Sequence, residues 1–189
     1  TDPAYYPGMV AASVLGGGYS ARLNQEIRIK RGLSYGAGAS LAARRTTGAF
    51  SASAQTKNES AADVAKVFLD EFAKIAAEPL DATAVANRKT LLNGAFQRQT
   101  QTSAGFNGIL AGAMLRGLDP NEAMAYADRI NAVSGQGATA SMARLLEPSR
   151  VSLVIVGDSA KFIDKLRALR PNVEVVGADK LDLATAAGP

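Results

Sequence analysis

Cysteine and histidine are both absent from the 189 residues of the chain. Without cysteine there is no disulfide bond, no thiolate nucleophile and no thiolate-bound metal. Without histidine there is no imidazole base and no Ser-His-Asp triad, and the ordinary catalytic zinc site is excluded because it nearly always contains histidine. An all-carboxylate site for magnesium or calcium stays open, but no EF-hand or clustered aspartate pattern supports one. We therefore expect no metal-binding residues in this chain.

Long apolar runs are also missing. No stretch approaches the roughly 18 residues that a membrane-spanning helix needs, and no segment has the pattern of a signal peptide. Hydrophobic residues make up 47% and charged residues 20%, which is ordinary for a globular protein. A chain of this length buries roughly two-thirds of its unfolded surface. We expect a single domain over residues 1–189, with a loose tail at 183–189 and no membrane segment.

Acidic residues are scarce in the first quarter of the chain. Residues 1–50 contain only Asp2 and Glu26 as acids against six basic residues, so this segment carries the whole net charge of +4. The six are Arg22, Arg28, Lys30, Arg31, Arg44 and Arg45. A nucleic-acid surface would need a longer basic stripe with interleaved aromatic residues, so we expect no nucleic-acid partner. Two interpretations stay open: an ordinary solvated face, or a surface for a polar partner or a peptide.

The first part of the chain predicts two helices and a hairpin. A helix is expected over about 4–15, ended by the glycines at 16–18, and a second over about 21–31, ended by Gly32. The period then changes to two. Small and apolar residues alternate over 35–43 and again over 49–55, which predicts an antiparallel hairpin with one face covered. In this pattern Tyr35 shares a face with Ala37, Ala39, Leu41 and Ala43.

The middle of the chain is predicted to be helical. Apolar residues recur at helical spacing over about 58–79, 82–96, 104–116, 118–133 and 137–146. Asp81 is expected to cap the second of these helices, and Ser60 with Asp63 to form a capping box in the first.

Two β-branched runs follow. Residues 150–157 are expected to form a central strand and residues 172–177 a last strand, with a helix over 159–169 between them. The elements do not alternate regularly between strand and helix, which favours an α+β fold. We expect a two-layer sandwich with a largely antiparallel sheet and helices packed on one face.

The glycines before a basic helix raise the question of a phosphate loop. The run LGGGYSARL at 15–23 fits neither common phosphate-binding motif, and no apolar strand precedes it, so a tight turn between helices is the better interpretation. Arg28 on the last turn of the helix and Tyr35 at the start of the strand can reach one rim. A guanidinium can hold a carbonyl or carboxylate, and a phenol can donate a hydrogen bond to an oxyanion. The plain alternative is a surface arginine and a solvated strand tyrosine.

A longer pattern lies in LGGGYSARLNQEIRIKRGLSYGAGAS, residues 15–40. It combines Leu-Gly-Gly-Gly, a Ser with Arg-Leu two residues on, a helix containing arginine, and Arg-Gly-Leu-x-Tyr opening a strand. It resembles the hallmark of the C-terminal-type, non-zinc domain in the pitrilysin, insulinase and mitochondrial processing peptidase family of zinc peptidases. The hairpin, the paired long helices and the segments at 142–158 and 179–183 also fit in order. The resemblance implies a processing-peptidase-like domain over most of the chain.

This resemblance also implies a division of work between two halves of a peptidase. The zinc half carries an inverted His-x-x-Glu-His motif that holds zinc and activates water. The other half supplies an arginine and a tyrosine, seven residues apart, that reach the substrate and its oxyanion. They match Arg28 and Tyr35, which are thereby the expected catalytic and substrate-binding residues. We expect a peptide substrate, no cofactor in this chain, zinc in a partner domain or subunit, and no activity from this chain alone.

Family domains begin with a strand before the DPAYY helix, and this chain starts at that helix, so the first strand is expected to be absent. A hetero- or homo-oligomer is expected. The alternative function is a catalytically silent scaffold or core subunit of the same family, against which the retained Arg28 and Tyr35 argue. Analogy with bacterial relatives favours the periplasm over the cytoplasm.

Overall fold

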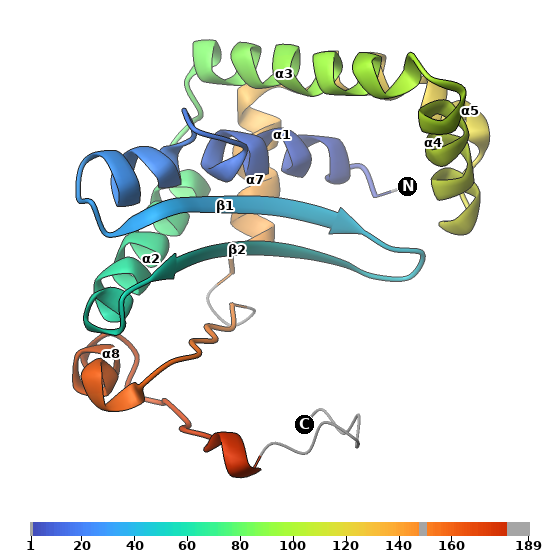
Figure 1. Cartoon of the computed structure of the whole chain (residues 1–189). Helices are drawn as coiled ribbons and strands as arrows, with labels where there is room; N and C mark the ends of the chain where they lie inside the picture. The colour runs from blue at the N-terminus through green and yellow to red at the C-terminus, as the bar shows by residue number, and fades with distance from the viewer. Residues whose placement is uncertain (1, 148–150, 181–189) are drawn as a thin grey trace.

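A computed structural model describes residues 2–147 and 151–180 (Figure 1). Its sheet is a two-stranded antiparallel hairpin of β1 (Ser34–Ala43) and β2 (Gly48–Thr56). The longer helices are α1 (Tyr5–Gly16), α2 (Ala61–Ala77), α3 (Ala82–Thr100), α4 (Ser103–Leu115) and α7 (Gly135–Leu145). The shorter ones are η1 (Asn24–Ile29), η2 (Asn58–Ser60), α5 (Pro120–Met124), α6 (Tyr126–Asn131), η4 (Ser159–Lys161), α8 (Ile163–Leu169) and η5 (Ala178–Lys180). The fold is mixed α+β and mostly helical.

The core lies between the hairpin and the helices that cover it. Figure 1 shows α1 running along β1, with α7 and α2 crossing behind the strands. Fully buried side chains from four helices meet there: Leu15 of α1, Ile27 of η1, Ile75 of α2 and Met142 of α7. Burying each such side chain contributes about 1.5–3 kcal/mol to folding. Within residues 2–147 and 151–180, no helix is both long and apolar enough to cross a membrane.

The hairpin departs from regular alternation at its open end. Ser34 pairs with Thr56 and Ala37 with Ala54, so β1 contains one more residue than β2 over this stretch. Such a bulge moves the following side chains to the opposite face. The prediction that Tyr35 shares the covered face with Ala37 is therefore wrong: Ala37 is buried, whereas Tyr35 is 84% exposed.

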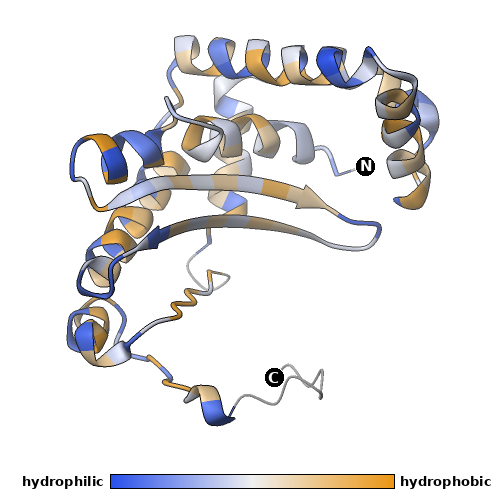
Figure 2. Ribbon diagram, viewed as in Figure 1, coloured by the Kyte–Doolittle hydropathy of each residue, from blue (hydrophilic) through white to orange (hydrophobic). Residues whose placement is uncertain are grey.

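The predicted strands at 150–157 and 172–177 are not strands in the structure, as far as they are described. A strand needs a hydrogen-bonded neighbour, and a cavity of about 600 Å3 lies between β2, α2 and the extended residues 151–156. Figure 2 shows this extended run as hydrophobic. One side of it still packs, because Ile155 and Val173 lie against a small cluster around Phe162. The larger sheet of the predicted sandwich is thus reduced to the hairpin.

Some of the predicted helix ends are confirmed and others are wrong. Asp81 caps α3 as predicted, since its Oδ1 accepts a hydrogen bond from Ala84 N at 2.8 Å. The capping box at Ser60 is wrong: its side chain caps nothing because η2 holds this residue in a helical conformation, whereas a cap needs an extended one. The helix predicted over 118–133 is divided into α5 and α6 at Ala125. The predicted tail at 183–189, and most of the 179–183 match, lie outside the described residues.

Candidate functional site

The turn between α1 and η1 is built from glycines that have to be glycines. A Cβ atom on Gly16 would lie 2.1 Å from the backbone nitrogen of Ala39, so the end of α1 approaches β1 more closely than any side chain allows. Gly18 has a φ of +126°, which other residues rarely adopt. The three glycines therefore bring the start of η1 directly against the hairpin.

Asn24 fastens this turn to the strand. Its Nδ2 donates a hydrogen bond to Gly18 O at 2.9 Å, and its Oδ1 accepts one from Ala37 N at 2.9 Å. The side chain is buried, so both bonds are shielded from water. One amide thus joins the glycine turn to η1 and β1, the two elements that hold the predicted site residues Arg28 and Tyr35.

Arg28 lies in a π-helical segment rather than in the regular helix that the sequence predicts. The wider turn is visible in the hydrogen bond from Lys30 N to Gln25 O, five residues back, at 2.9 Å. Short π-helical segments are rare and often lie at functional sites, because the extra residue redirects the side chains that follow. Gly32, with φ of +60°, then reverses the chain into β1.

The Arg28 guanidinium is held between two tyrosine rings. Its Cζ lies 4.3 Å from the ring centroid of Tyr19 and 4.6 Å from that of Tyr35, which is cation–π geometry. Both rings are open to solvent, with 63% of Tyr19 and 84% of Tyr35 exposed. The hydrogen bond and charge of Arg28 lower the pKa of Tyr19 from its ordinary 10.0. The predicted pair is thus brought together, and Tyr19 joins it.

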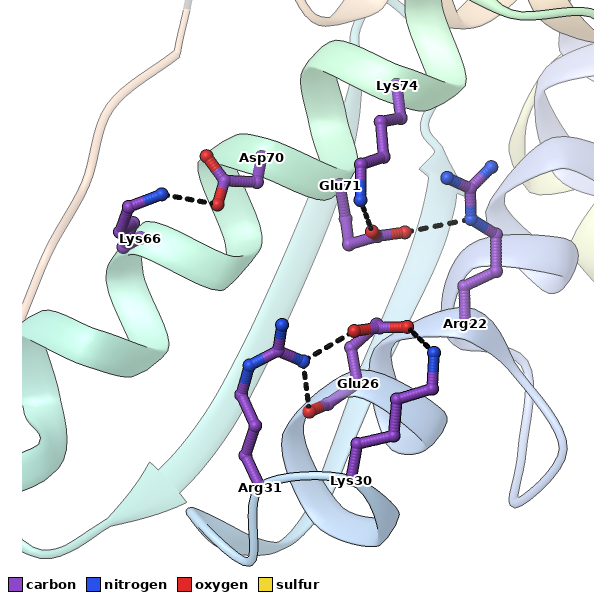
Figure 3. A network of polar contacts seen from close by, with 8 residues as sticks. All are labelled: Arg22, Glu26, Lys30, Arg31, Lys66, Asp70, Glu71 and Lys74. Carbon is purple, nitrogen blue, oxygen red and sulfur yellow. Dashed lines mark hydrogen bonds and ion pairs between the residues drawn. The ribbon is translucent and has the colours of Figure 1, made fainter.

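The carboxylates near Arg28 are paired with other cations (Figure 3). Glu26 pairs with Lys30 and Arg31, each at 2.5 Å, and these hydrogen bonds lower the pKa of Glu26 to about 2. Glu71, buried on α2, holds Arg22 at 2.8 Å and Lys74 at 3.0 Å. Among the described residues no carboxylate pairs with Arg28, so its charge is free to meet a ligand.

A buried arginine supports the same turn from the other side. Arg88 of α3 donates hydrogen bonds from Nη1 to Gly17 O at 3.2 Å and from Nη2 to Ser20 Oγ at 3.1 Å. Burial lowers its pKa from the ordinary 12.5. The backbone on both sides of Tyr19 is thereby anchored to α3, at Gly17 before it and at Ser20 after it.

Three residues of this site were not foreseen from the sequence. Tyr19 directly follows the glycine run. An aromatic residue at that place is the only local signal that it belongs to the site. Asn24 and Arg88 act through partners 13 and 71 residues away. Sequence spacing carries no sign of such contacts.

The site does not fit a metal ion. The described residues contain no group of three or more histidine, cysteine, aspartate or glutamate side chains that could hold one. The positive charge of Arg28 would also repel a metal cation. The chemistry available here is hydrogen bonding and charge stabilisation of an oxygen-bearing ligand.

Residues 1–92 match the family model described as the peptidase M16 inactive domain. Residues 1–92 therefore belong to a peptidase M16 inactive domain, of the pitrilysin and insulinase family. The matched M16 segment includes both Arg28 and Tyr35. A search of curated proteins finds no match.

Solved structures agree with the M16 fold. The crystal structure of a peptidase M16 inactive domain from Pseudomonas fluorescens matches 76% of this chain with a TM-score of 0.69 and 25% identity. A protein from Bordetella pertussis Tohama I, proposed to be a zinc protease, matches the same share with a TM-score of 0.66 and 14% identity, over 79% of its own chain. A protease from Helicobacter pylori gives 0.65 and 14%, with 76% of this chain and 35% of its own covered. The chain spans about a third of the Pseudomonas protein, 34% by coverage.

Proposed function

We propose that this M16 inactive domain is the non-zinc half of a metallopeptidase. It binds an extended peptide and supplies Arg28 and Tyr35 to the tetrahedral intermediate of peptide-bond hydrolysis. The observation that carries the proposal is the Arg28 guanidinium held between the rings of Tyr19 and Tyr35 with no carboxylate partner among the described residues.

The stack suits a carbonyl or an oxyanion. A guanidinium has five N–H donors, so Arg28 keeps donors for the oxygens of a peptide or carboxylate beside its contacts with the two tyrosines. The Tyr35 hydroxyl adds a neutral donor, and removing one such oxyanion donor costs about 10²–10³ in rate. Tyr19 is a positioning residue in this scheme, because it orients Arg28.

The open position of the site requires a second surface. Neither the cavity of about 930 Å3 nor that of about 600 Å3 is lined by Tyr19, Arg28 or Tyr35. Water must be excluded before a hydrogen bond can stabilise an oxyanion strongly. A partner domain or subunit with a His-x-x-Glu-His motif would close over the site, and its zinc would polarise the carbonyl and activate water. We propose the periplasm as the compartment, by analogy with bacterial members of the family.

Reconstitution tests the proposal. The chain and a His-x-x-Glu-His subunit from the same source are assayed for peptide hydrolysis with zinc, separately and mixed. We expect no hydrolysis by this chain alone, hydrolysis by the mixture, and a loss of about 10²–10³ in kcat for Tyr35→Phe. Arg28→Ala should lower kcat/KM, whereas Arg167→Ala, an exposed arginine on α8, should leave it unchanged.

Complex formation is measured in parallel, for example by analytical ultracentrifugation. An active mixture whose rate does not change in Tyr35→Phe would contradict the proposed role of Tyr35. A mixture that forms a complex but cleaves nothing would instead support the scaffold alternative.

A further inference from the structure

A second candidate site lies at the other end of the hairpin. An open cavity of about 930 Å3 is lined by the hairpin turn, the start of α1, the helices α3 to α6 and the end of α7. Figure 1 shows α4 and α5 standing beside the hairpin turn, at the end away from η1. A ten-residue strand such as β1 extends about 30 Å. The cavity is therefore remote from Arg28 and Tyr35.

The floor of the cavity is aromatic. Phe96 and Tyr126 stack with centroids 4.5 Å apart, Tyr6 meets Tyr126 edge-on at 6.1 Å, and Tyr5 meets Tyr6 at 5.2 Å. Burial raises the pKa of Tyr126 to about 12, so the hydroxyls of the floor stay protonated. Among the described residues, the Tyr126 hydroxyl donates its hydrogen bond to the sulfur of Met9, at 3.5 Å, and a thioether is a weak acceptor. The floor thus offers ring faces and a donor that is poorly satisfied.

The rim of the cavity is basic. Arg44 and Arg45 lie in the hairpin turn and Arg116 at the end of α4. The two elements are in contact here, because a Cβ atom on Gly117 would lie 3.7 Å from Nε of Arg45. Arg116 lies near the floor as well, since its charge opposes the rise in the pKa of Tyr5.

The acidic residues of the lining do not neutralise this rim. Asp2 pairs with Arg144 at 2.6 Å, and Glu122 with Arg129 at 3.0 Å. Within residues 2–147 and 151–180, Arg44, Arg45 and Arg116 have no ion-pair partner. Uncompensated guanidiniums beside an aromatic floor favour a ligand that is both anionic and apolar.

We propose that this cavity binds a peptide segment in which a large apolar or aromatic residue lies next to acidic residues. The apolar side chain lies on the floor of Tyr5, Tyr126 and Phe96, and the carboxylates meet Arg45 and Arg116. A volume of about 930 Å3 accommodates such a segment. A nucleotide is disfavoured because Gln99 is the one amide side chain in the lining that could read a base edge. The site is independent of the peptidase role proposed for Arg28 and Tyr35.

The absence of tryptophan from this chain gives a clean assay. A capped peptide Ala-Trp-Glu-Glu-Ala, excited at a wavelength that only tryptophan absorbs, reports its own binding through fluorescence anisotropy. The control peptide Ala-Trp-Lys-Lys-Ala has the same apolar residue with the opposite charge. We expect the acidic peptide to bind below about 1 mM and the basic one at least tenfold more weakly.

Three variants locate the binding. Arg45→Glu and Arg116→Glu should weaken it about tenfold or more, while Arg167→Glu on α8 makes the same charge change elsewhere and should not. Gly108→Leu should also weaken it, because Gly108 lines the cavity and a Cβ atom there meets nothing within 4 Å. Leucine favours the helix over glycine, so this variant should fold at least as stably as the parent.

The outcomes separate this site from the first. Equal binding of both peptides, or binding that survives Arg45→Glu and Gly108→Leu, would overturn the proposal. Loss in Arg28→Ala with no loss in Arg45→Glu would also overturn it, since the peptide would then be held at the Arg28 stack. Displacement by ATP at concentrations well below those of the acidic peptide would replace the proposed occupant with a nucleotide.

Discussion

The charge of Arg28 affects the ionisation of Tyr19, and this effect can be measured. Because the cation favours the phenolate, the pKa of Tyr19 lies below its ordinary 10.0. We expect Arg28→Gln to move the titration of Tyr19 back up toward 10, as followed by NMR of the labelled tyrosine ring carbon. Arg31→Gln is the matched control, because Arg31 pairs with Glu26 instead. A Tyr19 titration that is the same in both variants would contradict the stack.

Truncation of the Asn24 side chain should have a large effect on the stability of the fold. Asn24→Ala removes the amide that makes both hydrogen bonds of a buried bridge and leaves Gly18 O and Ala37 N unsatisfied. We expect a loss of about 2–4 kcal/mol in the free energy of unfolding, measured by urea denaturation. Asn93→Ala, on α3, removes a half-buried side chain whose Nδ2 donates one hydrogen bond to Asn131 Oδ1, and should cost about 1 kcal/mol or less. Similar losses in the two variants would mean that the Asn24 bridge contributes no more to stability than the hydrogen bond of Asn93.

At the scale of single residues, the sequence predicts some members of the site and not others. Arg28 and Tyr35 could be chosen because their spacing belongs to a pattern that is local in the chain. The outward position of Tyr35 could not, because it depends on a bulge set by the register with β2. Asn24 and Arg88 are ordinary polar residues until the fold surrounds them.

Among the elements, α2 is joined to the start of η1 through one buried carboxylate. Glu71→Gln removes the charge that holds Arg22 and Lys74. We expect a loss of about 1–3 kcal/mol in unfolding free energy, because one acceptor of a buried network becomes a donor. Asp70→Asn changes the neighbouring residue, whose pair with Lys66 is exposed, and should cost less than about 0.5 kcal/mol. Equal effects would show that burial of Glu71 adds nothing.

Helices were predictable where their own sequence determines them. The region 58–79 carries a full apolar stripe, and α2 forms inside it; Asp81 ends up as the cap of α3. The runs at 150–157 and 172–177 have equally strong strand composition. They fail as strands because a strand is completed by its neighbour, and a cavity lies beside residues 151–156.

At the scale of the whole molecule, the lowered pKa of Glu26 predicts that the stability of the fold decreases at acidic pH. Its folded pKa of about 2 lies below the ordinary 4.5, so the stabilisation is complete above pH 4.5 and is lost as the pH falls toward 2. Because Lys30 and Arg31 are largely exposed, the loss is about 1 kcal/mol. Urea denaturation at a series of pH values should show a shallower acid slope for Glu26→Gln. Glu59→Gln, at an exposed carboxylate, should retain the slope of the parent; an unchanged slope in Glu26→Gln would contradict the assignment.

The π-helical turn of η1 and the bulge in β1 are each one residue longer than their regular counterparts. A deletion within 24–27 would restore a regular helix and rotate Arg28 by about 100° relative to the preceding turn, and a deletion of Gly36 would restore the alternation of the strand. Either event separates the guanidinium from a ring in one step, whereas most substitutions in the segment leave the path of the backbone intact. We therefore expect the Arg28 site to be constrained in length more than in composition, with insertions or deletions between Asn24 and Ala37 disrupting it.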